Sequence, residues 1–441
     1  MRQERSLTAL MTVLLFLLLI PTSVWAVVYV DIDNIKGPWD GDSWATAYKS
    51  VQEGLNDAEK SGDEVWVAEG TYKPTSDTDR SVSFRLRPGV DLYGGFQGTE
   101  TRLDQRDWRE NSTILSGDIG KQGEKSDNST HVVVGANDAV IDGFTITGGF
   151  GGPPRGGPPG MGPKGGPPGT GPPGNKGQPG KGGPPVHITP EIVIRESGKR
   201  SGNGMVNFQC APTIRNCVFK DNHGGKGGAM YNMVSKSFRR GPGVKEPAPT
   251  VINCTFIGNS AMGRGGAVSN DLGTHPTFVG CKFINNSCER GKGGAMYNDF
   301  GCSPTIINCV FTGNSAFGGG AIGNDGRSSP TITNCTFTGN RAIDMGAALY
   351  QGTGPPSEPI VTNSILWGNI CSAGPSEVYN WHESNAVIRY SCVEGGYPGE
   401  GNIDADPMFV DVENKDYRLA PGSPEIPGMM TSRCPTSFWL R

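Results

Sequence analysis

One short motif recurs along the second half of this 441-residue chain. Each copy has a cysteine, a phenylalanine two positions later, an asparagine three positions after that, and then Gly-Gly-Ala or Gly-Ala-Ala. Successive motif cysteines are 37, 27, 28 and 26 residues apart, within the period of roughly 20 to 50 residues that marks a solenoid. A solenoid is a scaffold, so its activity must be sought in surface side chains. The motif cysteines are Cys217, Cys254, Cys281, Cys309 and Cys335.

The residues within each repeat favour strands over helices. The repeated runs are Pro-Thr-Ile, Cys-x-Phe and Gly-Gly-Ala-Met-Tyr, which are rich in β-branched and aromatic residues and bounded by Gly, Asn, Asp and Pro. No repeat contains a helical stripe of ten or more residues. The sequence therefore predicts an all-β fold, a right-handed parallel β-helix with three short strands per coil.

The repeat also predicts which side chains stack. Because side chains alternate across a strand, Cys217 and Phe219 should point inward and Val218 outward, and equivalent residues should stack about 4.8 Å apart. The second glycine of each Gly-Gly pair should allow a turn where a Cβ atom would clash. The motif asparagines should form a hydrogen-bonded ladder at a corner, where Asn also tolerates a left-handed backbone. These asparagines are Asn222, Asn259, Asn286, Asn314 and Asn340.

The N-terminus has the features of an export signal. Arg2 and Arg5 precede an apolar run from Leu7 to Ile20, and small residues lead to Ala26. We expect a secretory signal peptide, residues 1–26, and the alternative is an uncleaved anchor. No other segment is apolar enough to cross a bilayer, so we expect no transmembrane segment in the mature chain. The net charge of −4 gives no reason to expect nucleic-acid binding.

One β-helix domain is predicted over residues 27–428, followed by a tail at 429–441. Its N-terminal cap, 27–70, should contain a helix over 44–60 that protects the first coil. A Gly/Pro-rich, collagen-like segment at 150–201 should be a loop inserted into one coil, with trimerisation as the alternative. Regular repeats then cover 202–395 and a closing segment covers 396–428. A second insert, 233–248, is basic, so both inserts are candidates for contact with an acidic partner such as an anionic polysaccharide.

Eleven cysteines in an exported protein raise the question of disulfides. The repeat phase places Cys210 and Cys302 three coils apart, too far for a bridge, and the same holds for Cys288 and Cys371. The stacked motif cysteines lie closer, but parallel neighbours rarely offer the dihedral that a disulfide requires. We therefore expect small buried thiols, and the spacing does not suggest a zinc site.

Alignment of the repeats reveals one candidate site. Asp271, Asp299 and Asp325 each follow an asparagine and precede a proline by five residues, so they should stack on three successive coils. Such carboxylates are candidates for binding a ligand or Ca²⁺, or for acid–base work in a glycoside hydrolase. The alternative is that Asn-Asp only makes turns. A lyase would also need a basic residue in this stack, and we expect none; the histidines share no repeat phase.

Phe-x-x-Asn followed by Gly-Gly-Ala-Ile, as in Phe311 to Asn314 and Gly319 to Ile322, resembles the repeats of the chlamydial polymorphic outer membrane protein family. That family is similar to the pectate-lyase-like β-helix superfamily, and the resemblance covers about 202–370. It implies a secreted or surface-exposed, outer-membrane-associated protein, often adhesive. We therefore predict an exported binding or adhesion module for carbohydrate or another surface. The alternative is a polysaccharide lyase or glycoside hydrolase. No catalytic residue is assigned, and the only cofactor considered is Ca²⁺.

Overall fold

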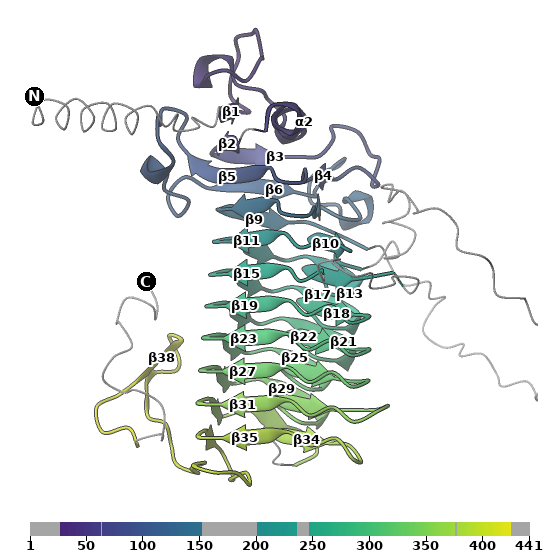
Figure 1. The fold of residues 1–441 in the computed structure, drawn as a ribbon, viewed down its shortest axis with the longest axis vertical. Coiled ribbons are helices and arrows are strands. Elements are labelled where there is room, and N and C mark those ends of the chain that lie inside the picture. Colours follow the sequence, from purple (N-terminus) through teal and green to yellow (C-terminus); the bar gives the residue numbers. More distant parts are fainter. Residues whose placement is uncertain (1–26, 63, 152–200, 236–246, 375–376, 425–441) are drawn as a thin grey trace, which may run out of the picture.

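The computed structural model describes residues 27–62, 64–151, 201–235, 247–374 and 377–424. Its short parallel strands stack coil upon coil along one long axis (Figure 1). Four parallel sheets run along this axis, of 11, 10, 9 and 6 strands. The predicted parallel β-helix is confirmed.

We name the sheets A to D. Sheet A contains β1 (Val27–Val30), β2 (Glu64–Ala68), β5 (Asp91–Phe96), β8 (Val140–Asp142), β11 (Thr213–Arg215), β15 (Thr250–Ile252), β19 (Thr277–Val279), β23 (Thr305–Ile307), β27 (Thr331–Thr333), β31 (Ile360–Thr362) and β35 (Val387–Arg389). Sheet B contains β3 (Gly70–Tyr72), β6 (Thr113–Ser116), β9 (Phe144–Thr147), β12 (Val218–Lys220), β16 (Thr255–Ile257), β20 (Lys282–Ile284), β24 (Val310–Thr312), β28 (Thr336–Thr338), β32 (Ile365–Trp367) and β36 (Cys392–Val393).

Sheet C contains β4 (Phe84–Arg85), β7 (Val133–Val134), β10 (Met205–Phe208), β14 (Met230–Met233), β18 (Val268–Asp271), β22 (Met296–Asn298), β26 (Ile322–Asn324), β30 (Leu349–Gln351) and β34 (Val378–Asn380). Sheet D contains β13 (His223–Lys226), β17 (Ser260–Arg264), β21 (Ser287–Lys292), β25 (Ser315–Gly318), β29 (Arg341–Met345) and β33 (Ile370–Cys371). The chain visits the sheets in the order A, B, D, C in each regular coil.

Sheet D corrects the expected number of strands per coil from three to four. Its strands pair with shifted register, for example between Gly224 and Lys226. They contain glycine and charged residues, as in His223–Lys226, and lack the β-branched and aromatic signal that identified the other three strands. Pairing with the neighbouring coils makes these segments strands despite that composition.

The interior consists of stacked identical side chains, as predicted. Five phenylalanine rings lie parallel, with centroids 4.5 to 4.9 Å apart and planes within 6°. Each motif asparagine accepts hydrogen bonds on Oδ1 from the backbone and side-chain nitrogens of the previous one, for example Asn259 to Asn286, both 3.0 Å. The ladder continues through Asn340 to Asn369. The buried amide groups of successive coils are thus hydrogen-bonded in the same way.

One detail of the corner differs from the prediction. The ladder asparagines are not among the residues with positive φ; the residue before each motif cysteine is, an asparagine in four repeats, for example Asn253 with φ of 52°, and Gly280 in the fifth. The ladder amides therefore stay in ordinary backbone conformations. At the Gly-Gly corner, Gly265 has φ of 58°, and a Cβ atom on Gly266 would lie 2.1 Å from the carbonyl oxygen of Gly294. The predicted clash is confirmed.

A second amide ladder runs inside sheet C. Side-chain Nδ2 atoms donate to the next coil at 2.7 to 2.8 Å, and the ladder ends on Oε1 of Gln351. The Nε2 atom of Gln351 is buried and has no partner. Its members are Asn207, Asn232, Asn270, Asn298, Asn324 and Gln351.

The helix of the N-terminal cap is shorter than the predicted 44–60. Helix α2 spans Val51–Ser61, after a single 3-10 turn at Trp44–Thr46. Tyr48 lies in an extended segment, because its backbone exchanges hydrogen bonds with β1. Val51, Leu55 and Ala58 face the core, and α2 contacts β1, β2 and β4, so it covers the end of the solenoid.

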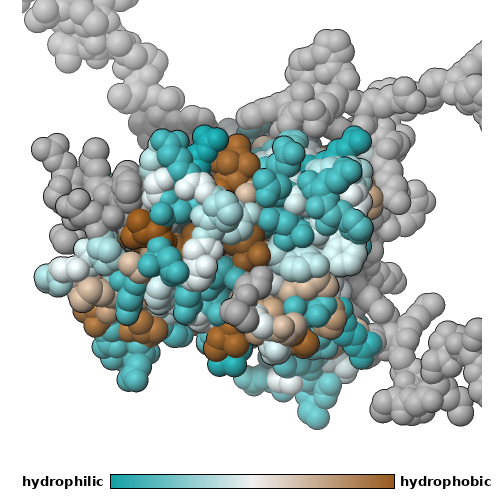
Figure 2. Space-filling model, turned by 90° about the horizontal axis from the view of Figure 1, so that it is seen from below, coloured by the Kyte–Doolittle hydropathy of each residue, from teal (hydrophilic) through white to brown (hydrophobic). Residues whose placement is uncertain are grey.

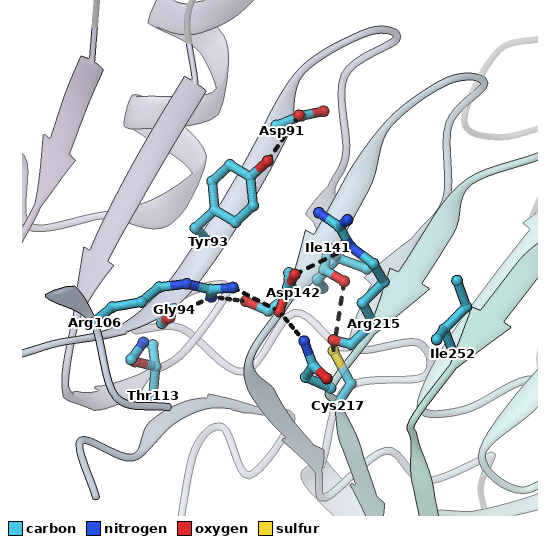
Figure 3. Close-up of polar contacts among 12 residues, drawn as sticks. Asp91, Tyr93, Gly94, Arg106, Thr113, Ile141, Asp142, Arg215, Cys217 and Ile252 are labelled. Atoms are coloured by element: carbon cyan, nitrogen blue, oxygen red, sulfur yellow. Dashed lines mark hydrogen bonds and ion pairs between the residues drawn. The ribbon is translucent and has the colours of Figure 1, made fainter. Parts of the chain in front are cut away.

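A buried ion-pair cluster fixes the loop 97–112 onto sheet A (Figure 3). Asp142 of β8 is bonded by Arg106 from that loop at 2.9 Å and by Arg215 of β11 at 3.1 Å. Asn216 donates a further 2.8 Å hydrogen bond to Oδ1 of Asp142, and Arg106 lies over the ring of Tyr93. The loop therefore covers the outer face of sheet A at its N-terminal coils.

The closing segment turns back along the outside of sheet B. Its antiparallel strands are β37 (Phe409–Asp411) and β38 (Asp416–Leu419). The hydroxyls of Tyr417 and Thr312 lie 2.6 Å apart in a buried contact between residues 105 positions apart. All ten described cysteines are free thiols, and nine of them are buried, as predicted.

Candidate ligand-binding face

The three predicted aspartates stack on the outer face of sheet C. Each follows an asparagine of the inner amide ladder, and because side chains alternate, each carboxylate points outward. Their side chains are nevertheless only 6 to 9% exposed. A buried carboxylate needs a partner of opposite charge or several hydrogen-bond donors. The aspartates are Asp271, Asp299 and Asp325.

Three cations from sheet D supply that partner. Lys226, Arg264 and Lys292 occupy equivalent positions at the ends of β13, β17 and β21. Lys226 Nζ lies 2.9 Å from Asp271 Oδ2, Lys292 Nζ lies 2.9 Å from Asp325 Oδ2, and Arg264 is paired with Asp299. Each pair joins one coil to the next. We call these six residues the charged seam.

The expectation that no basic residue lies in phase with the aspartates is therefore wrong. The cations follow their ladder asparagines by four, five and six residues, so they are out of phase when counted from the asparagine. Counted back from Gly-Gly they are in phase, because each is the residue directly before that pair. The variable bulge in sheet D separates the two counts.

Charges in the seam are present or absent in pairs. Where a cation would stand in the next coil, the chain has Gly318, and where its acid would stand it has Gly352. A Cβ atom on Gly352 would lie 1.8 Å from Oδ1 of Asp325. The coil that lacks the cation therefore also lacks the acid, so neither charge is left buried without its partner.

Tyrosines of sheet C complete the seam. Tyr231 donates a 2.8 Å hydrogen bond to Asp271 Oδ2, and Tyr297 donates to Asp325. Lys226 and Arg264 lie over the rings of Tyr231 and Tyr297, at 5.6 and 5.1 Å from the centroids. Burial and the nearby carboxylates raise the pKa of both phenols, so these tyrosines remain hydrogen-bond donors. Burial raises the pKa of Asp299, while Arg264 opposes that shift.

In the charged seam the cations are partly exposed and the carboxylates are buried. The side chains of Lys226 and Arg264 are 36 and 39% exposed and that of Lys292 is 25% exposed, against at most 9% for the acids. The outer surface of these coils therefore offers N–H donors spaced by one coil. The aspartates neutralise and position the cations from beneath.

Aromatic side chains continue the same face towards the C-terminal coils. The rings of Tyr350 and Tyr379 are stacked 5.8 Å apart, and Tyr379 lies 6.2 Å from Trp381, which contacts His382. Tyr350 is buried under Lys292, at 4.4 Å, whereas Tyr379 and Trp381 are partly exposed. We call these four residues the aromatic end; no repeat motif predicts it.

The described ranges contain neither a cluster of metal ligands nor a membrane-spanning helix. No group of three or more His, Cys, Asp or Glu side chains there is arranged to hold a metal ion. No helix in the same ranges is long and apolar enough to span a membrane. The signal peptide and most of both predicted inserts, residues 152–200 and 236–246, lie outside the described residues.

Comparisons with known proteins agree with the repeat. Residues 253–271 match the model of the Chlamydia polymorphic membrane protein repeat. No curated protein matches the chain. Similar solved structures include the deglycosylated pectin methylesterase of Aspergillus niger, at 11% identity over 92% of this chain and 94% of that one, with a TM-score of 0.32. Another is the GH136 lacto-N-biosidase of Eubacterium ramulus, at 11% identity over 82 and 67% of the two chains, with a TM-score of 0.34.

Both structural likenesses are too distant to indicate an activity for this chain. The repeat match covers one coil, from Asn253 through the ladder residue Asn259 to Asp271. The chain is thus a parallel β-helix protein whose repeats resemble those of the Chlamydia polymorphic membrane proteins.

Proposed function

We propose that this protein is an exported, surface-associated β-helix that binds carbohydrate along the outer face of sheet C. The observation that carries the proposal is the coexistence, on that face, of a row of partly exposed cations and a partly exposed aromatic end. Aromatic rings contact the apolar faces of sugars, and N–H donors bind hydroxyl and carboxylate groups.

The spacing favours an extended polymer with acidic groups. Lys226, Arg264 and Lys292 are displaced by one coil each, about 4.8 Å along the axis. A chain lying along the axis would meet one cation per coil and then the aromatic end. Exposed ion pairs are individually weak, at about 0 to 1 kcal/mol, so binding would depend on their repetition.

The test is retention of the mature protein on immobilised polygalacturonate, with an uncharged xylan matrix as comparison. We expect retention on polygalacturonate that falls at high salt, and loss of most of it in the Lys226→Met/Lys292→Met double variant. The matched control is Lys220→Met, an exposed lysine on sheet B. Equal retention of the control and the double variant would contradict the proposal.

An enzyme is the second candidate, because the seam does place basic residues beside carboxylates. A hydrolase requires carboxyl groups that reach the substrate, and these acids are covered, so only the partly exposed cations could contact a substrate. Incubation with pectin and assay of reducing ends and unsaturated products distinguishes binding from turnover. Activity lost in the Asp271→Asn/Asp299→Asn/Asp325→Asn variant would favour the enzyme.

Calcium is the remaining candidate ligand of the three aspartates. Because each carboxylate is paired with a cation, Ca²⁺ would have to compete with that cation. If Ca²⁺ binds here, it should raise the thermal midpoint more in Lys226→Met/Lys292→Met than in the unaltered protein. An equal shift in both would place calcium elsewhere.

Surface location is tested separately from binding. The proposal rests on the predicted signal peptide, residues 1–26, and on the resemblance of the repeat to that of the Chlamydia polymorphic membrane proteins. Fractionation of cells producing the full chain should find the protein in the envelope or medium, shortened at its N-terminus. Full-length protein confined to the cytosol would contradict it.

A further inference from the structure

The C-terminal end of the solenoid holds a cavity of about 540 Å³. It lies between β35 and the segment 397–400, which crosses the end of the last coil. Ligand pockets typically measure roughly 300–1,000 Å³, so this volume suits one or two sugar rings. Figure 2 looks onto this end of the molecule, where polar and apolar side chains lie intermixed.

Hydrogen bonds hold one wall of the cavity rigid. The Nδ2 atom of Asn380 donates to the hydroxyl of Tyr397 at 2.8 Å, and that hydroxyl donates to the carbonyl of Ala386 at 3.0 Å. The amide of Ala386 donates back to Oδ1 of Asn380 at 3.1 Å, which closes a ring. A wall that is already ordered loses little freedom when a ligand binds.

The rim is held just as firmly. Asn402 donates from Nδ2 to the carbonyls of Ile388 and Tyr397, both at 3.0 Å, and accepts from the amide of Ser391. The amide of Tyr390 donates to the carbonyl of Glu400 at 2.8 Å. The segment that forms the outer side of the cavity is therefore a fixed part of the fold.

The lining combines apolar surface with polar groups of both kinds. Val387 and Pro398 supply carbon surface and Tyr397 a phenol ring, while the lining residues Ala386 and Ile388 are themselves buried in the core. Asn385, Arg389 and Glu400, all exposed, supply amide, guanidinium and carboxylate groups. This is the mixture that recognises a sugar, whose C–H faces are apolar and whose hydroxyls both donate and accept.

The amide ladder of sheet C is interrupted at this place. Gln351 and Asn380 are partners in register, but the Asn380 amide is engaged with Ala386 and Tyr397. The buried Nε2 atom of Gln351 consequently has no partner. The Asn380 side chain therefore forms part of the cavity wall and does not extend the ladder.

We propose that this cavity is a second saccharide site, which takes the one or two terminal residues of a glycan chain. Arg389 donates to its hydroxyl or carboxylate groups, Glu400 accepts from its hydroxyls, and Tyr397 packs against a ring face. The site is separate from the face of sheet C, since Tyr379 and Trp381 alternate with Asn380 along the strand and lie on its other side.

The test is saturation-transfer NMR of the mature protein with D-galacturonate, D-glucose and N-acetylglucosamine. We expect transfer to at least one sugar, reduced at least fivefold by Asn385→Trp, which fills the cavity, and by Arg389→Met. Lys220→Met, on sheet B and outside both proposed sites, should leave the signal unchanged. Circular dichroism and the thermal midpoint establish that each variant is folded.

Three results would overturn the inference: no transfer to any of the sugars, transfer unaffected by both cavity variants, or transfer abolished by Trp381→Ala alone. The last result would assign sugar binding to the aromatic end. Loss of polygalacturonate retention in Lys226→Met/Lys292→Met with normal saturation transfer would confirm two independent sites.

Discussion

The inside and the outside of sheet C follow different rules. Inside, the ladder repeats the same amide in five coils and a glutamine in the sixth, because each group donates to the next and accepts from the previous one. Outside, the same strands change from an apolar cluster around Val206 and Phe208, through the charged seam, to the aromatic end. The interior repeats because buried amides must all be paired, and the exterior varies because nothing in the fold requires it to repeat. The varying outer face of sheet C is the one on which the binding of carbohydrate is proposed.

The largest effect should come from breaking an interior ladder. Asn286→Leu leaves two donor N–H groups of Asn259 without their acceptor in the core and removes a hydrogen bond to the carbonyl of Phe256. Unsatisfied buried groups cost about 1–3 kcal/mol each, so we expect a loss of about 3 kcal/mol or more in the free energy of unfolding. Urea denaturation followed by circular dichroism measures it. The matched control is Ser287→Ala on the outward side of sheet D. An equal loss of stability in that variant would contradict a specific contribution of the ladder hydrogen bonds.

The seam should respond asymmetrically and less strongly. Arg264→Met leaves Asp299 buried without its cation, whereas Asp299→Asn leaves a cation that can turn to solvent. We expect a loss of about 2 kcal/mol for the first and about 1 kcal/mol or less for the second. The double variant should lose less than the sum, as in a coupled pair. Additive losses in urea denaturation would contradict the pairing that the two glycines of the next coil indicate.

The sequence alone predicts the interior ladders and the aspartates, but not the cations, the aromatic end or the cavity. Cys, Phe and Asn ladders were predicted because each recurs at a fixed distance within the motif, and stacking follows from the pleat. The aspartates were found because Asn-Asp keeps its distance to the following proline. The cations were missed because a strand of variable length separates them from the asparagine, and the aromatic end was missed because Tyr379 and Trp381 follow the last regular motif. The cavity depends on contacts between β35 and residues 397–402, which no local pattern encodes.

A smaller effect is expected where the corner ladder ends. Asn369 donates from its backbone and side chain to the carboxylate of Glu377, at 3.3 and 2.8 Å. Burial raises the pKa of Glu377 to about 8, although the bonds from Asn369 oppose the shift, and Glu394 adds to it. A carboxyl that ionises later in the folded protein than in the unfolded chain contributes stability at low pH. That contribution is lost as the pH rises from about 4.5 towards 8.

Glu377→Gln should therefore flatten the fall in stability between these pH values, since an amide keeps an acceptor for Asn369 and does not titrate. The measurement is the urea midpoint of both proteins at pH 5 to 9. Glu394→Gln, which removes the neighbouring carboxylate that accepts from the amide of Gly368, is the control and should change the slope less. An unchanged slope in Glu377→Gln would contradict a raised pKa of Glu377 in the folded protein.

The smallest effect is expected from reducing agent. All described cysteines are free, and the motif thiols are buried, with Cys281 and Cys309 held at raised pKa by burial. Dithiothreitol should leave the thermal midpoint unchanged, because a buried protonated thiol neither forms a disulfide nor reacts readily. A fall in the midpoint on reduction would reveal a bridge and would overturn the interpretation of these residues as core.

The amide ladder of sheet C also gives the solenoid an electrical direction. Its side-chain N–H bonds all run towards the C-terminal coils, so the bond dipoles add as they do along a helix. In the corner ladder, by contrast, each asparagine also donates back to the previous coil. One end of the molecule is left with acceptors, such as the unpartnered Oδ1 of Asn207, and the other with donors, such as Nε2 of Gln351. The carboxyl oxygens of Glu377 close the corner ladder at its donor end, where an ammonium group would meet N–H groups of its own sign. A coil grafted onto that end would have to place a hydrogen-bond acceptor against these N–H groups. The two ends of this scaffold are therefore not interchangeable.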